Sequence, residues 1–130
     1  MISNYKYGKR KELQVGEILQ RRGFLWGRAH GSRGPIDLFA QKGSRILAIQ
    51  VKSTRKTSIS SARLTQCEED RLLEACYGRR ETAVLALVMR NFVYLVRVTD
   101  RKILFKGDLK PLKYLPFTKF KLNMTLDNVS

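Results

Sequence analysis

Three polar residues of this chain fall where two strands are expected to meet. Asp37 begins one expected strand, and Gln50 and Lys52 lie two residues apart near the end of the next. Side chains two apart on a strand point to the same face, and paired strands lie about 4.8 Å apart. The three side chains therefore come together if the two strands pair in a suitable register.

These groups are suited to divalent metal chemistry. The side-chain oxygens of Asp37 and Gln50 and the main-chain oxygen of Val51 are the hard donors that Mg²⁺ prefers. Lys52 beside such an ion can orient or deprotonate a water, or stabilise charge that develops on a phosphate. Glu12, on an expected helix, supplies a second carboxylate. The set is what metal-assisted phosphodiester hydrolysis requires.

Each of these residues also has an ordinary structural interpretation. Asp37 can satisfy a turn locally, and Lys52 can extend from a strand end into solvent. Gln50 can lie on an exposed face, and Glu12 can pair with a neighbouring cation on its helix. The sequence alone leaves both interpretations open.

The elements that position these residues follow from hydrophobic periodicity. Helices are expected at 9–22 and 62–77, each ended by a glycine, with a mobile arm at 1–8. Strands are expected at 24–29, 36–40, 45–52, 82–89 and 92–98, with a final edge strand over 120–126. This order predicts an α/β fold, a central mixed β-sheet flanked by a helix on each face. The length fits a single domain over 1–130, with a core at about 5–98 and a tail at about 99–130.

The net charge indicates an anionic partner. The chain has 26 Lys plus Arg against 11 Asp plus Glu, a formal charge of +15. Residues 1–63 hold 14 of these cations and only three acids. Nucleic acid is the first candidate for the partner, and its binding would be strongly salt-dependent.

A membrane partner is not expected. The longest apolar run, 83–89, is far shorter than the ~20 residues that cross a bilayer. The basic residues are spread over strands and loops, not gathered on one amphipathic helix. Two cysteines are too few for a disulfide scaffold, and no secretory signal is visible. We therefore expect a cytoplasmic, DNA-associated protein.

Two basic segments and one loop are the expected contacts to a nucleic-acid backbone. The segments contribute Lys9, Arg10, Lys11, Arg55 and Lys56, and the loop contributes His30, Ser32 and Arg33. These residues carry no code for base edges, so recognition of shape and backbone is expected. The alternative is a solvated charged surface, with His30 and Ser32 serving the loop itself.

The motifs together resemble a known nuclease superfamily. Gly31-Ser32 precedes Asp37, and Gln50-Val51-Lys52 follows on the next strand, which is similar to the PD-(D/E)xK pattern. The basic stretch that leads into Glu12 narrows the resemblance to the archaeal Holliday junction resolvases, over residues 5–98. The resemblance implies a restriction-endonuclease-like fold and a structure-selective DNA endonuclease. It also implies Mg²⁺, with Mn²⁺ as an alternative, and a homodimer that cuts four-way junctions by symmetric nicks.

The resemblance also assigns roles to individual residues. The catalytic set is Glu12, Ser32, Asp37, Gln50 and Lys52, and the metal set is Glu12, Asp37, Gln50 and Val51. One position departs from the family pattern, because Gln50 stands where these resolvases have Glu. An amide oxygen lacks the full charge of a carboxylate and is a poorer Mg²⁺ ligand.

Three functions therefore remain open. Mrr-type restriction endonucleases are similar in having Gln at the position of Gln50, so this residue does not by itself imply a dead enzyme. The first alternative is a non-catalytic nucleic-acid-binding protein on a nuclease fold. The second is an Mrr-like endonuclease that acts on duplex DNA.

Overall fold

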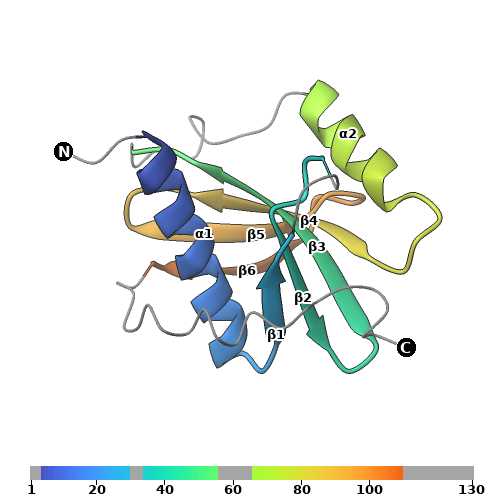
Figure 1. The fold of residues 1–130 in the computed structure, drawn as a ribbon, viewed down its shortest axis with the longest axis horizontal. Helices are drawn as coiled ribbons and strands as arrows, with labels where there is room; N and C mark the ends of the chain where they lie inside the picture. The colour runs from blue at the N-terminus through green and yellow to red at the C-terminus, as the bar shows by residue number, and fades with distance from the viewer. Residues whose placement is uncertain (1–3, 30–33, 56–65, 110–130) are drawn as a thin grey trace.

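Six strands form one mixed sheet whose spatial order follows the chain, β1-β2-β3-β4-β5-β6. The computed structural model describes residues 4–29, 34–55 and 66–109 (Figure 1). The helices are α1 (Asn4–Arg21) and α2 (Gln66–Cys76). The strands are β1 (Leu25–Arg28), β2 (Leu38–Lys42), β3 (Arg45–Ser53), β4 (Thr82–Val88), β5 (Phe92–Arg97) and β6 (Ile103–Asp108).

Only one pair of neighbouring strands is parallel. β3 and β4 run in the same direction, and the chain between them passes through α2. A parallel pair needs such a crossover, whereas β1, β2 and β3 form an antiparallel meander and β4, β5 and β6 form a second. This arrangement makes β3 and β4 the centre of the sheet. β4 is buried along almost its whole length, as its continuous apolar run predicts.

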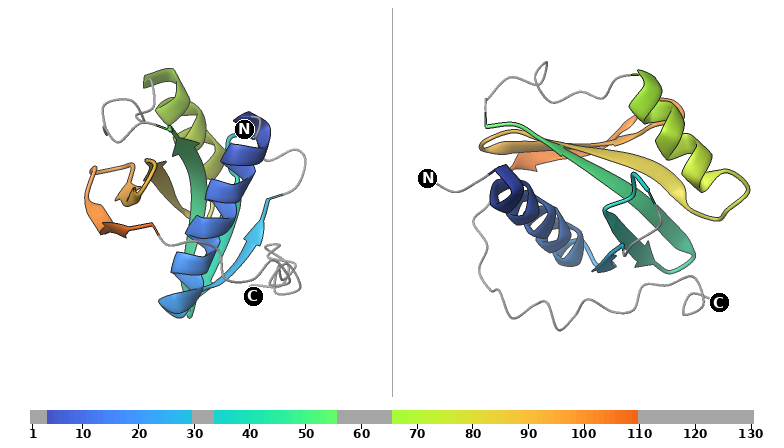
Figure 2. Two further views of the ribbon diagram at one scale, coloured as in Figure 1. Left: turned by 90° about the vertical axis from the view of Figure 1, so that its left-hand side faces the viewer. Right: turned by 45° about the horizontal axis from the view of Figure 1, so that its top comes forward.

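The two helices cover opposite faces of the sheet (Figure 2). α1 packs Val15, Ile18 and Leu19 onto a core that includes Leu38 and Ile49. The other face carries a second core beneath α2. The structure therefore confirms the predicted α/β architecture, with a mixed sheet and a helix on each face. No helix in the described residues is long and apolar enough to cross a bilayer.

α1 is longer than the sequence predicts, because it begins at Asn4 and not at residue 9. The expectation of a mobile arm is therefore wrong for residues 4–8. The cause is tertiary, since the Tyr7 hydroxyl donates to the Thr54 carbonyl at 2.9 Å and ties this first turn to the end of β3. The far end of α1 is as predicted: Gly23 follows it with φ +91°, a conformation that favours glycine.

β6 is an edge strand that the sequence analysis placed in the tail. Its residues are mostly half-exposed and include Gly107, so they lack the strong apolar pattern of β4. Pairing with β5 defines the strand, from Phe92 opposite Asp108 to Val96 opposite Ile103. The edge strand expected over 120–126 and the first four residues of the helix expected at 62–77 lie outside the described residues.

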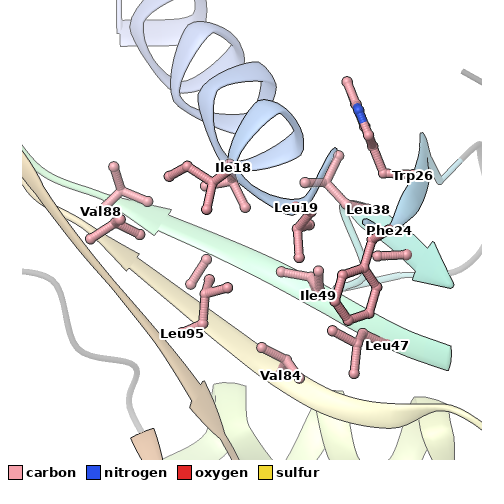
Figure 3. Packing of buried hydrophobic residues seen from close by; sticks show 14 residues of the cluster. Ile18, Leu19, Phe24, Trp26, Leu38, Leu47, Ile49, Val84, Val88 and Leu95 are labelled. Carbon is pink, nitrogen blue, oxygen red and sulfur yellow. The ribbon is translucent and has the colours of Figure 1, made fainter. Parts of the chain in front are cut away.

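Close packing of α1 on the sheet depends on Gly16. Figure 3 shows the core side chains beneath this helix, with Trp26 at its edge. A Cβ added at Gly16 would lie 2.6 Å from carbons of the Trp26 indole. The ring is held by its Nε1, which donates to the Gln20 side chain at 3.1 Å. The indole therefore has little freedom to move aside.

Gly16→Ala is expected to lower the free energy of unfolding by about 1–2 kcal/mol. Overpacking costs about 1–3 kcal/mol and exceeds the ~1 kcal/mol gained when alanine replaces a helical glycine. Gly8→Ala is the matched control, because a Cβ there meets only Ser53 Oγ at 4.0 Å. We expect the control to be neutral or stabilising in urea denaturation. Equal changes in the free energy of unfolding for the two variants would contradict the close packing of Gly16 on Trp26.

Candidate metal and nucleic-acid site

Asp37 lies at the start of β2, where the ladder with β3 ends. Its main-chain N–H donates to the Ile49 carbonyl at 2.8 Å, and its Oδ2 accepts from the Val51 N–H at 2.8 Å. Leu38 is opposite Ile49 in the strand register. This is the register that the sequence argument required. The carboxylate is fixed against the backbone of the strand that carries Gln50 and Lys52.

The environment of Asp37 favours its protonated form. The pKa of this carboxyl is raised to about 6, first by burial and then by the nearby charge of Glu12. The hydrogen bond from Val51 and the positive charge of Arg28 act in the opposite direction. A buried carboxylate beside a second acid is stabilised in its ionised form by a bound cation. The raised pKa of Asp37 is therefore consistent with a cation site.

Glu12 approaches this site from α1 and is held by Arg28 on β1. The Arg28 guanidinium lies 3.2 Å from Glu12 Oε1, and both side chains are largely buried. Arg28 is opposite Leu38 in the register, one residue beyond Asp37. Sequence reasoning missed Arg28. The only available signal was a cation inside an apolar strand, and its partner cannot be found without the fold.

Gln50 and Lys52 point to the face that α2 covers, because Leu47 and Ile49 point to the α1 face. Gln50 Oε1 is buried and accepts no hydrogen bond from the part of the chain that the structure describes. Lys52 Nζ lies 3.2 Å from Glu68 Oε2 on α2. The predicted common face of Gln50 and Lys52 is therefore present. Glu68 was not predicted, since its position depends on how α2 crosses the sheet.

These residues fit a hard divalent cation. The Gln50 oxygen is buried and has no donor among the described residues, the Asp37 carboxylate is desolvated, and Glu12 adds charge nearby. In an extended strand the N–H and C=O of one residue point toward the same neighbour, so the Val51 carbonyl also faces the side of Asp37. No cluster of three or more His, Cys, Asp or Glu side chains occurs in the described residues. A metal bound here would need neutral oxygens beside the acids, which are the donors that Gln50 and Val51 offer.

Cations gather where the first turns of α1 meet the end of β3. The Arg55 guanidinium stacks 4.2 Å from the Tyr7 ring centroid. Lys9 lies one turn before Glu12 on α1, and Arg10 is exposed. The expected backbone contacts Lys9, Arg10 and Arg55 therefore lie on elements that meet beside the candidate site.

Lys11 differs from these cations because it is buried. Its Nζ lies 5.0 Å from the Tyr7 ring centroid and donates to the Arg90 carbonyl at 3.4 Å. Burial lowers the pKa of this amine, and the charge of Arg10 lowers it further. A position that ties α1 to the β4–β5 turn does not favour a direct phosphate contact. His30, Ser32, Arg33 and Lys56 lie outside the described residues.

The strand order, with Asp37 against the strand that carries Gln50 and Lys52, is that of a restriction-endonuclease-like α/β fold. A sequence model of the archaeal Holliday junction resolvase (Hjc) family matches residues 3–91. The chain therefore belongs to the archaeal Holliday junction resolvase family.

A solved structure supports the same assignment. Hjc from Archaeoglobus fulgidus, described as a Holliday junction resolvase from an archaeal hyperthermophile, superposes with a TM-score of 0.59 and 28% sequence identity. The alignment covers 78% of this chain and 88% of the Archaeoglobus chain. No curated protein sequence matches. The resemblance stated from the motifs is thus confirmed at the level of family and fold.

Proposed function

We propose that this protein is a metal-dependent DNA endonuclease that resolves four-way junctions by symmetric nicks. The observation that carries the proposal is the Asp37 carboxylate, which accepts from the Val51 N–H at 2.8 Å on the strand where the Gln50 oxygen is buried and accepts no hydrogen bond from the described residues. Lys52 follows on the same strand, and the surrounding chain is strongly basic. Family membership supports the junction as substrate.

In the proposed mechanism each residue has a separate task. Asp37, Gln50 and the Val51 carbonyl would hold Mg²⁺ or Mn²⁺, with Glu12 adding negative charge. When bound, such an ion activates water and stabilises charge on the reacting phosphate. Lys52 orients the attacking water or stabilises the phosphate, and the Arg28 pair keeps Glu12 in place. Ser32 and His30 remain proposed contacts from their loop.

The basic surface binds the substrate without sequence specificity. Lys9, Arg10 and Arg55 contact phosphates near the metal site, and Arg33 and Lys56, which lie outside the described residues, remain proposed phosphate contacts. Each neutralised phosphate adds to the salt dependence of binding. Contacts of this kind recognise the shape of a branched DNA and not its bases.

A symmetric homodimer is part of the proposal. One metal site cuts one strand, so two opposed nicks require two copies of the chain. Two-fold dimers are also the commonest symmetric oligomers. Sedimentation of the protein alone and bound to a junction would show a dimer in the active complex. A complex with one copy per junction that still makes paired nicks would contradict this.

A cleavage assay on a panel of DNA substrates tests the activity. Purified protein with Mg²⁺ or Mn²⁺ should nick a four-way junction symmetrically, leave duplex DNA intact, and stop when EDTA is added. Preferred cutting of duplex DNA would favour the Mrr-like alternative. Failure to cut junction, flap, duplex and single-stranded DNA with either metal would refute the proposal.

A second candidate function follows from Gln50. A neutral side chain at this position also fits a protein that binds junctions and does not cut them. Such a protein would bind DNA with strong salt dependence but with no change on addition of EDTA. The same assay panel separates the two functions.

Gln50→Glu is expected to raise metal affinity by at least about tenfold. A full negative charge would replace a neutral donor in a partly buried site, where charge interactions are strong. Cleavage at limiting Mg²⁺ should rise with it, and calorimetric titration of the metal measures the change directly. Gln41→Glu is the charge-matched control, because Gln41 lies at the other end of β2 and bonds the Gly43 carbonyl. Equal metal affinities for the two variants would exclude Gln50 as a ligand.

A further inference from the structure

A pocket of about 340 Å³ lies at the end of the sheet away from Asp37. It is enclosed by the last turn of α1, the β2–β3 hairpin and the edge strand β6. Its apolar lining residues are Leu19, Phe24, Leu47, Leu95, Leu104 and Phe105. Figure 3 shows several of these side chains below the end of α1. The pocket therefore opens from the main core onto the surface.

Four cations complete the lining, and no acid takes part. They are Arg21, Arg22, Lys42 and Arg45. The Arg22 guanidinium lies 4.7 Å from the Phe105 ring centroid, and the Lys42 amine and the Arg45 guanidinium each lie 5.8 Å from the Phe24 ring centroid. Lys42 Nζ donates to the Arg22 carbonyl at 2.9 Å. Arg21 is paired with Glu17, 4.0 Å away on the same helix, but no acid lines the hydrophobic floor over which the cations are spread.

We propose that this pocket docks an acidic peptide segment of a partner protein, with one large apolar side chain inserted between the cations. The apolar side chain would fill the floor and gain the free energy of burial. Carboxylates on either side of it would pair with Arg22 and Arg45, which present planar groups suited to bidentate bonds. One peptide would then bury the apolar floor and pair with the cations around it.

A nucleic-acid base fits the same pocket poorly. Every lining side chain is either apolar or a hydrogen-bond donor, so the amino groups of a base would find no side-chain acceptor. Burying such groups unpaired costs free energy. A duplex backbone would contact the cations but would leave the apolar floor in water. Charge and shape therefore favour the peptide over DNA.

The pocket is separate from the proposed nuclease site. Arg45 and Val51 are six residues apart on β3, which corresponds to about 20 Å at the rise of an extended strand. A partner seated here leaves the Asp37 end of the sheet open. The docking proposal therefore does not depend on cleavage activity.

Binding of a synthetic peptide to the full chain tests the proposal. The probe is fluorescein-labelled Asp-Glu-Asp-Leu-Phe-Asp-Glu-Asp, and its anisotropy reports binding. Arg45→Glu should weaken binding at least about tenfold, because it places a like charge at the rim. Lys102→Glu makes the same charge change at an exposed position that does not line the pocket, and it should weaken binding less than about twofold. Replacing Leu-Phe in the probe by Ser-Ser should also remove most of the affinity.

Three results would overturn the proposal. They are no measurable binding of the probe, equal binding of the Ser-Ser probe, and equal losses in the two variants. If single-stranded DNA displaces the probe, and Arg45→Glu also weakens the binding of that DNA, the pocket would be assigned to nucleic acid instead. A junction-cleavage assay on Arg45→Glu, run in parallel, reports the nuclease function separately.

Discussion

Asp37→Asn is expected to abolish junction cleavage, with a loss of at least about 10³-fold, and at the same time to stabilise the fold at neutral pH. The loss follows because a neutral amide cannot replace the charge of the carboxylate that is bonded to the β3 backbone at the proposed metal site. The gain follows because the variant removes a carboxylate whose ionisation is unfavourable in its buried position. A purely structural aspartate would show the opposite effect on stability.

The pH dependence of this gain has a definite sign. The folded state raises the pKa of Asp37 from 3.8 to about 6, so it binds the proton more tightly than the unfolded chain does. The wild-type protein therefore loses stability as pH rises from about 4 to about 6, by up to about 3 kcal/mol at 1.36 kcal/mol per pKa unit. Asn does not titrate, so the variant should exceed the wild type above pH 6 and lose that advantage below pH 4.

Urea denaturation in EDTA at pH 4 and pH 8 measures this difference. EDTA is needed because a bound cation would stabilise the ionised carboxylate of the wild type and mask the effect. Asp108→Asn serves as the control, since Asp108 is exposed at the end of β6. A variant at position 37 that is less stable than the wild type at pH 8 would show that the carboxylate acts mainly as a structural hydrogen-bond acceptor.

Local patterns in the sequence were sufficient for the central part of the site. The Lys42 to Ser44 turn predicted the β2–β3 hairpin, whereas the sequence left the register of the two strands open. The register in the structure brings Asp37 against Val51, on the strand that carries Gln50 and Lys52. The alternation of side chains along a strand placed Gln50 and Lys52 on one face. These features depend on neighbours within about fifteen residues, and for such neighbours sequence patterns are informative.

Features that depend on distant packing were not predictable. Arg28 reaches Glu12 across sixteen residues because β1 lies beneath α1, and Lys52 reaches Glu68 because α2 crosses the end of β3. The early start of α1 has the same origin in the Tyr7 to Thr54 bond. β6 has a weak pattern of its own and is fixed by pairing with β5. In each case a long-range contact overrides or replaces the local signal.

Lys52→Met is expected to reduce cleavage by about 10²–10⁴-fold while changing stability by less than about 1 kcal/mol. A positioned cation or proton donor beside the reacting phosphate contributes a factor of this size. The stability change is small because Lys52 pairs with Glu68 near the surface, with 39% and 30% of the two side chains exposed. Methionine keeps the length of the apolar stem, so packing against the sheet is retained.

Glu68→Gln tests whether catalysis needs the Lys52 amine to be held in position, and not only to be present. The variant keeps Lys52 but removes the carboxylate 3.2 Å from its Nζ, and we expect kcat to fall by about three- to tenfold with metal affinity unchanged. Glu69→Gln is the matched control, because it removes the same charge from the same helix turn at a carboxylate that bonds Arg101. Both variants raise the net charge equally, so nonspecific DNA binding should strengthen equally. If the two rates are the same, Lys52 does not need Glu68 for catalysis.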